Sequence, residues 1–162
     1  MLTSTYILSQ IFVIINYLFL IITYQLKDNK KILILNTIAC ISSTIAFFLL
    51  DAYIGCSMTL IAVIRNIIFN KDKSINSLLI IFILMLLFSI YTYENLFSLV
   101  PVCGTLLYTI SIWQNNNKVY KILGIPVEIC WLFYQIYILS IFGIILELVL
   151  FVSVIVGIIK EK

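Results

Sequence analysis

The sequence contains no histidine, and only 10% of its 162 residues are Asp, Glu, Lys or Arg. The absence of histidine removes the commonest metal ligand and general base of proteins. The four cysteines lie singly within apolar runs, at Cys40, Cys56, Cys103 and Cys130, without the paired spacing of a metal site. The sequence also lacks a nucleophile elbow and a phosphate-binding loop. We therefore predict that the protein is not an enzyme and binds no cofactor or metal.

Apolar residues make up 64% of the chain, and its mean hydropathy is +1.20. A water-soluble domain of 162 residues could not bury this much apolar surface, so we expect membrane lipid around it. The formal net charge is only +3, and the basic residues form four short clusters between the apolar runs, which indicates membrane topology and no binding of nucleic acid. The clusters are Lys27, Lys30 and Lys31; Arg65, Lys71 and Lys73; Lys118 and Lys121; and Lys160 and Lys162.

The apolar runs predict seven membrane-spanning helices. A span needs about 20 residues, whereas the runs 32–69 and 119–159 are each long enough for two spans. Each run must therefore fold back, the first at Asp51 to Tyr53 and the second near Tyr137 to Ser140. The predicted helices are 6–24, 32–50, 54–69, 77–92, 96–113, 119–137 and 140–159. Because basic residues collect on the cytoplasmic side of a membrane, we expect the N-terminus outside and the C-terminus in the cytoplasm.

The two halves of the sequence repeat one polar pattern. A shift of 88 residues aligns Asn36, Cys40, Ser43 and Phe47 with Gly124, Glu128, Trp131 and Gln135, and Gly55 and Thr59 with Gly143 and Glu147. The first four positions share one face of a helix. Two like-oriented units of three helices need one further helix between them. We therefore predict an all-α membrane protein with two parallel three-helix bundles, residues 1–73 and 95–162, joined by a linker helix within 74–94.

Several short segments resemble the YgjV family of bacterial inner-membrane proteins. These segments are Pro101 to Gly104, Trp113 with Gln114, Trp131 to Tyr134, Gly143 to Glu147, and Arg65 and Asn66 with Phe69. The resemblance covers nearly the whole chain and implies a location in the bacterial inner membrane. The YgjV family is similar in layout to the SWEET and PQ-loop transporters, whose paired three-helix bundles enclose a substrate path. The resemblance therefore implies a SWEET-like 3+1+3 arrangement, although the Pro-Gln dipeptide of PQ-loop proteins is absent here.

Two acids within the apolar runs are the strongest candidates for a functional role. Glu147 lies near the membrane midplane, where a charged carboxylate costs at least about 2.5 kcal/mol. It is interpreted either as a solute-binding or proton site or as a neutral side chain that ties two helices together. Glu128 shares a helix face with Trp131 and Gln135, which suits a path for polar solutes. Alternatively, Glu128 forms an ion pair with Arg65.

Further polar residues extend this candidate path. Arg65 lies close to the predicted cytoplasmic end of its helix, so we expect it to reach the membrane interface or to pair within the protein. Asn66 and Thr59 lie on one helix face and are candidate walls of the path, or contacts in a packing seam. Ser43, on the first repeat of the polar pattern, is assigned to the same path.

Other positions are assigned to gating or to anchoring. Pro101, Pro126 and Gly143 are candidate structural or gating residues, and the two prolines could act as hinges or as fixed kinks. Tyr24 and Trp113 end their predicted helices and are interpreted as anchors at the membrane interface.

Two functions of different class fit these observations. The first is a carrier or facilitator of an unknown small polar solute, sugar-like or another polar metabolite, along a central path between the bundles. The second is a non-transporting membrane protein whose polar stripes only hold helices together or assemble with a partner. Two bundles in one chain could form a complete path, so both a monomer and a homodimer are compatible with the sequence.

Overall fold

The computed structural model describes residues 4–160, and this part of the chain consists of helices and short connections without any strand. The helices are α1 (Ser4–Thr23), α2 (Asn29–Leu49), α3 (Tyr53–Lys71), α4 (Ile75–Tyr91), η1 (Leu96–Ser98), α5 (Leu99–Trp113), α6 (Asn117–Tyr137) and α7 (Ile141–Ile159). The prediction of seven long helices is confirmed. The segment 96–113 differs from the prediction in one respect, because its first three residues form the 3-10 helix η1 and only the remainder is α-helical.

Six of the seven α-helical segments are long and apolar enough to cross a membrane. The remaining helix, α4, has 17 residues. At 1.5 Å per residue, 17 residues rise about 26 Å, slightly less than the hydrocarbon core of about 30 Å. A membrane crossing by α4 therefore stays a prediction.

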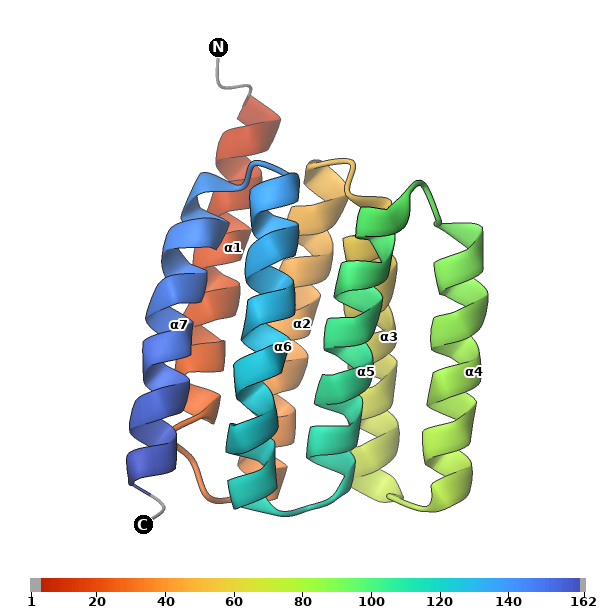
Figure 1. Cartoon of the computed structure of the whole chain (residues 1–162), viewed down its shortest axis with the longest axis vertical. Helices are drawn as coiled ribbons and strands as arrows, with labels where there is room; N and C mark the ends of the chain where they lie inside the picture. The colour runs from red at the N-terminus through yellow and green to blue at the C-terminus, as the bar shows by residue number, and fades with distance from the viewer. Residues whose placement is uncertain (1–3, 161–162) are drawn as a thin grey trace.

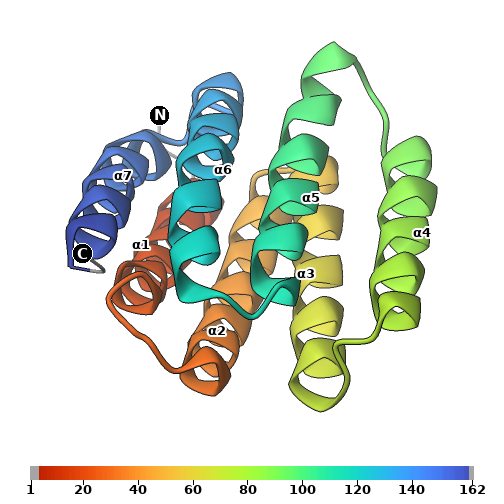
Figure 2. The ribbon, with the colours of Figure 1, turned by 60° about the horizontal axis from the view of Figure 1, so that its bottom comes forward.

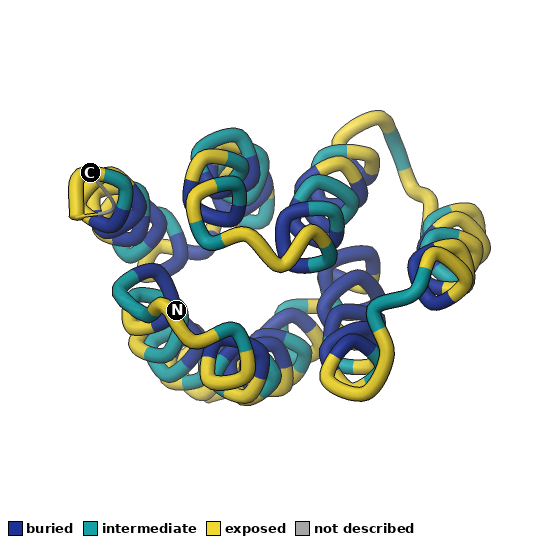
Figure 3. Tube along the Cα trace, turned by 90° about the horizontal axis from the view of Figure 1, so that it is seen from below, coloured by how far each residue is buried: buried dark blue, intermediate teal, exposed yellow. Residues whose placement is uncertain are grey.

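The helices stand side by side in two rows (Figures 1 and 3). One row contains α1, α2 and α3, and the other contains α5, α6 and α7, with successive helices in contact. The rows meet at both edges, where α1 contacts α7 and α3 contacts α5. The helix α4 lies outside the two rows, against α3 and α5. The space between the rows is therefore enclosed by six helices from the two halves of the chain.

The helices end at residues with clear stereochemical reasons to stop. Asp51, Asn115 and Leu139 adopt positive φ angles of 55°, 55° and 54°, which reverse the chain after α2, α5 and α6. The side chains of Asp28 and Asn116 accept hydrogen bonds from the first backbone N–H groups of α2 and α6. The turns predicted at Asp51 and near Leu139 thus coincide with the α2–α3 and α6–α7 connections.

The distribution of side chains is that of a protein surrounded by lipid. Large apolar residues lie on the outer faces of the helices, including Leu87 on α4, which is 58% exposed. Polar residues gather on the faces between the rows, where Figure 3 shows the buried parts of the chain. The α1–α2, α3–α4 and α5–α6 connections, in or near which most of the lysines lie, are at the same end of the molecule as the end of α7 (Figure 1).

Asp72 organises the connection between α3 and α4 at this basic end. Its carboxylate accepts hydrogen bonds from the Ser74 hydroxyl at 2.6 Å, the Ser77 hydroxyl at 2.6 Å and the Ser74 backbone N–H at 3.0 Å. These hydrogen bonds, those from the Ser74 and Ser77 hydroxyls first, hold the pKa of the Asp72 carboxyl below its ordinary value of 3.8. Their contribution to stability is therefore present above pH 3.8 and is lost as the pH falls through the lowered pKa.

We expect acid to loosen this connection in a way that Trp113 reports. The Trp113 indole N–H donates to the Lys73 backbone carbonyl at 2.9 Å, next to Asp72. In a Trp131→Phe background, the emission of Trp113 should shift as the pH falls below 3.8, and Asp72→Asn should abolish the transition. Asp51→Asn, at the opposite end of the molecule, is the matched control and should leave the transition in place. An unchanged transition in Asp72→Asn would contradict the assignment.

Candidate functional site

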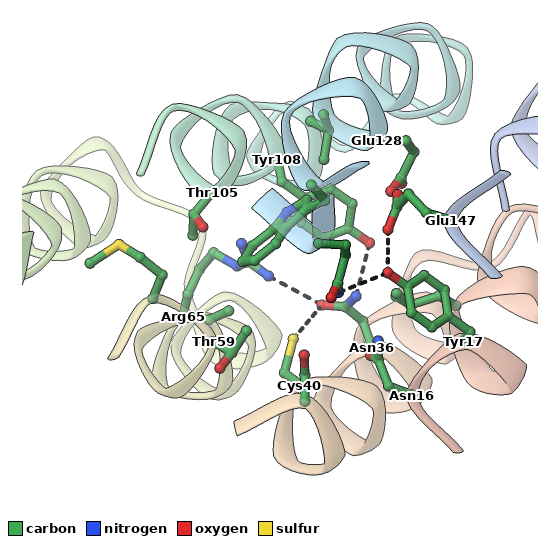
Figure 4. A pocket seen from close by; sticks show the side chains of 17 residues that line it. Asn16, Tyr17, Asn36, Cys40, Thr59, Arg65, Thr105, Tyr108, Glu128 and Glu147 are labelled. Carbon is green, nitrogen blue, oxygen red and sulfur yellow. Dashed lines mark hydrogen bonds between the residues drawn. The ribbon is translucent and has the colours of Figure 1, made fainter. Parts of the chain in front are cut away.

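A cavity lined by both polar and apolar side chains lies between the two helix rows (Figure 4). Its volume is about 60 Å³, enough for a few water molecules. Residues of α1, α2, α3, α5, α6 and α7 line it. The polar ones are Asn16, Tyr17, Asn36, Ser43, Thr59, Arg65, Thr105, Tyr108, Glu128, Gln135 and Glu147.

One end of the cavity carries two acids. Glu147 on α7 is 1% exposed and accepts a hydrogen bond from the Tyr17 hydroxyl, and Glu128 on α6 is 4% exposed and accepts one from the Tyr24 hydroxyl. The two carboxyl groups lie next to each other (Figure 4). Ionised carboxylates can only accept hydrogen bonds, so the two acids can bond each other only when one of them carries a proton.

The acid pair also leaves one acceptor open. Glu147 Oε1 is buried and makes no hydrogen bond of its own among the described residues, whereas Glu147 Oε2 is bonded to Tyr17. The Tyr17 hydroxyl in turn accepts a hydrogen bond from Gln135 Nε2 at 3.1 Å. The acid pair is therefore held by Tyr17 of α1 and by Tyr24, which follows α1, and Glu147 Oε1 stays available for a further donor.

The other end of the cavity carries Arg65 of α3, which is 0% exposed. Its guanidinium donates to Thr109 Oγ1 at 3.2 Å, to Asn36 Oδ1 at 3.1 Å and twice to Asn66 Oδ1, at 2.9 and 3.0 Å. The guanidinium carbon also lies 5.1 Å from the centre of the Tyr108 ring. No acid is among these partners in residues 4–160. The positive charge is therefore solvated by neutral groups only.

Asn36 of α2 connects this arginine to the rest of the cavity. Its Oδ1 accepts from Arg65 at 3.1 Å and from Asn66 Nδ2 at 2.7 Å. Its Nδ2 donates to the Tyr108 hydroxyl at 2.9 Å, and the Tyr108 and Tyr120 hydroxyls are 2.9 Å apart. The Tyr120 ring stacks on the ring of Tyr24, which bonds Glu128, with 5.0 Å between centroids. A continuous network of contacts thus joins the arginine end to the acid end.

Most of the predicted path residues lie around this one cavity. The cavity is lined by Glu147, Glu128, Trp131, Gln135, Thr59 and Ser43. Asn66 lies behind this wall and bonds both Arg65 and Asn36. The Trp131 indole stacks on Phe47 with 5.7 Å between ring centroids, and so forms an apolar part of the wall.

The predicted gating residues lie away from the cavity lining. Pro126 is within α6, whereas Pro101 is in the first turn of α5, where a proline interrupts no helical hydrogen bond. The roles of Pro101 and Pro126 as hinges or as fixed kinks stay predictions. Gly143 is buried in the first turn of α7, where a Cβ atom would collide with the side chains of Gln135 and Ser140. Its small size permits this close contact of α6 and α7.

The structure also decides between the interpretations of three further residues. Of the two alternatives for Arg65, extension to the membrane interface is wrong, because its hydrogen bonds hold it inside the protein. Glu128 is not its ion-pair partner, since Glu128 is bound by Tyr24 and lies against Glu147. Tyr24 is not an interface anchor, because it is 0% exposed and bonds Glu128.

Sequence reasoning also missed several cavity residues. Asn36 was noticed in the repeated pattern but was not assigned to the path, and Asn16, Tyr17 and Tyr108 were not singled out. The signal for the two asparagines was available, because a side-chain amide inside an apolar span needs a polar environment. No comparable signal existed for Tyr17 and Tyr108, which resemble the other tyrosines of the chain until their partners are known.

The comparisons with known proteins agree with this structure. Residues 7–162 match the model of Imp-YgjV, a family described as bacterial inner membrane protein. The chain belongs to this family. The Imp-YgjV match confirms the predicted family and supports a multi-pass location in the bacterial inner membrane. No curated protein and no solved structure matches the chain. The likeness to SWEET and PQ-loop transporters stays a prediction.

Proposed function

We propose that this Imp-YgjV protein is a carrier or facilitator of a small polar solute across the inner membrane. The observation that carries the proposal is the central cavity, whose lining includes Arg65, Glu128 and Glu147 inside a protein of apolar, membrane-spanning helices. Ionisable groups at such a depth are costly, and in membrane proteins they mark solute or proton pathways by default. Both helix rows contribute to the walls, so a relative movement of the rows would change access to the cavity.

The arrangement of the helices supports this function. A two-fold axis along the membrane normal would map α1, α2 and α3 onto α5, α6 and α7, and the contact of α1 with α7 onto that of α5 with α3. We interpret the two rows as the two bundles of a 3+1+3 transporter architecture, with α4 as the linker that gives them the same orientation. The basic end of the molecule faces the cytoplasm in this proposal, which places the N-terminus outside.

The size of the cavity bears on the mechanism. In this conformation it accommodates only a few water-sized molecules, so a larger solute enters only if the rows separate. Pro126 lies within α6, where it removes a backbone hydrogen bond, and we assign it as the hinge of this movement. All walls come from one chain, so a monomer suffices for the proposed path.

The test is uptake by vesicles that contain the purified full chain. Wild-type vesicles should accumulate at least one solute from a panel of sugars, polyols, amino acids and small organic acids. Glu147→Gln and Trp131→Ala should each lower that flux to the level of empty vesicles, because they alter the acid end and the apolar wall. Glu94→Gln and Trp113→Ala are the matched controls, since both residues lie outside the cavity lining. Absence of uptake across the whole panel would refute the carrier.

One observation favours the non-transporting alternative. The cavity groups form hydrogen bonds between helices. The bond of Tyr17 to Glu147 joins α1 to α7, and the bond of Tyr24 to Glu128 joins the end of α1 to α6. If these bonds only hold the helices together, Glu147→Gln lowers the melting temperature and no solute ever raises it. A melting temperature that rises with a solute decides against this alternative.

A further inference from the structure

The two ends of the cavity have opposite polarity, and we infer from this that the transported solute is a small zwitterion of the amino-acid type. Its anionic group binds at Arg65 and its ammonium group binds at Glu147. The inference rests on the proposed function and gives it a substrate class. Two observations support the inference: Arg65 and Glu147 each have an unused hydrogen-bonding position, and the two ends of the cavity carry opposite charges.

Arg65 provides the anion-binding end. A guanidinium has five N–H donors. Arg65 donates four hydrogen bonds, one from Nε, two from Nη2 and one from Nη1, which bonds Thr109. The remaining donor of Nη1 belongs to a side chain that lines the cavity. An uncompensated guanidinium buried at this depth is costly, and a carboxylate is the group that satisfies it best, through both charge and geometry. The arginine end therefore selects an anionic group.

Glu147 provides the cation-binding end. Its Oε1 is buried without a hydrogen-bond partner among the described residues, while its Oε2 is bonded to Tyr17. When one of the two neighbouring carboxyl groups is protonated, the pair carries a single negative charge. An ammonium group has three N–H donors and no acceptor, so it complements an open carboxylate oxygen. The acid end therefore selects a protonated amine.

The charge balance requires both groups on the same solute. One guanidinium and one singly charged acid pair leave the cavity without net charge, although its ends are polarised. A zwitterion has no net charge either, and it pairs with both ends. A simple anion or a simple amine would leave one uncompensated charge at membrane depth, which is costly. A neutral polyol could bond both ends but would compensate neither charge.

The volume of the cavity points to the smallest members of this class. A volume of about 60 Å³ suits a glycine or an alanine better than a long or aromatic amino acid. The Trp131 indole and Met58 form the apolar part of the wall, where a hydrogen or a methyl group fits.

The test is thermal unfolding of the purified full chain in detergent with four probes of similar size at matched ionic strength. Glycine carries both charges, glycolate lacks the ammonium group, ethanolamine lacks the carboxylate, and glycerol carries no charge. Glycine should raise the melting temperature in proportion to the logarithm of the glycine concentration. Alanine, tested in a second titration, should do the same. The other three probes should leave the melting temperature unchanged.

Two variants assign the ends of the solute. Asn36→Asp places a carboxylate at the position that now accepts from Arg65 at 3.1 Å, so the arginine gains a permanent counter-charge and the protein stays folded. Glycine affinity should then fall about ten- to a hundredfold, because the arginine is already paired. Glu147→Gln should cause a loss of the same size at the other end. Tyr134→Phe, which removes a buried hydroxyl outside the cavity lining, is the control and should keep the glycine response.

The possible results separate this inference from the proposed function. A rise in melting temperature with glycerol, or with glycolate or ethanolamine alone, overturns the zwitterion while the carrier stands. A glycine response that survives in Asn36→Asp overturns the assignment of Arg65. If no probe raises the melting temperature but the vesicles take up a sugar, the substrate class is wrong and the carrier is right. If no solute gives either response, both proposals fail.

Discussion

Asn36→Leu is expected to lower the free energy of unfolding by about 3 kcal/mol. Leucine is similar in size to asparagine, but it removes the acceptor for Arg65 and for Asn66 and the donor for Tyr108. A single hydrogen bond between membrane helices contributes only about 0.6 kcal/mol on average. The larger figure follows because one of the orphaned donors belongs to a buried, charged guanidinium that has no acid partner in the described part of the chain. The measurement is unfolding in mixed detergent micelles.

The chain provides two controls for this prediction. Asn16 of α1 also lines the cavity, but its side chain makes no hydrogen bond to another described residue. Asn16→Leu makes the same chemical change and should therefore alter stability by less than about 1 kcal/mol. Asn36→Asp keeps an acceptor for Arg65 and should remain close to the wild type. Equal losses in Asn36→Leu and Asn16→Leu would show that Asn36 does not organise the arginine end.

Gly157→Ala is expected to destabilise the protein by about 2–3 kcal/mol. A Cβ atom at Gly157 would lie 2.5 Å from the backbone carbonyl oxygen of Tyr24, where α7 passes the end of α1. A side chain could rotate away from such a clash, but a backbone oxygen moves only if the two segments separate. Because the Tyr24 hydroxyl bonds Glu128, the separation should also disturb the acid end of the cavity. We therefore expect lower solute flux together with the loss of stability.

A change of similar size on the lipid-facing side of the same helix provides the control. Val152 of α7 is 58% exposed, and Val152→Leu adds one carbon atom, as Gly157→Ala does. Because lipid accommodates the extra carbon, the free energy of unfolding should stay within about 0.5 kcal/mol of the wild type. A stable Gly157→Ala variant with full flux would mean that α1 and α7 do not depend on this close approach.

The sequence alone was sufficient for the features that depend on local composition. Long apolar runs require helices in lipid, and the length of the runs 32–69 and 119–159 requires each to fold back, which α2 with α3 and α6 with α7 do. The depth of Glu128 and Glu147 also follows from their distance to the helix ends. The repeated polar pattern was informative because both of its copies line the same cavity, through Ser43 and Thr59 in one half and Glu128 and Glu147 in the other.

Only the tertiary structure decided which of these groups meet. Tyr17 and Glu147 are 130 positions apart, and their contact depends on how α1 and α7 are rotated and shifted against each other. Neither quantity is encoded in the local pattern, because the apolar faces of such helices can pack in several registers. For the same reason Arg65, expected at the interface or beside Glu128, is bound by Asn36, Asn66 and Thr109. Local sequence determined how deep each polar group lies, and packing between distant segments determined its partner.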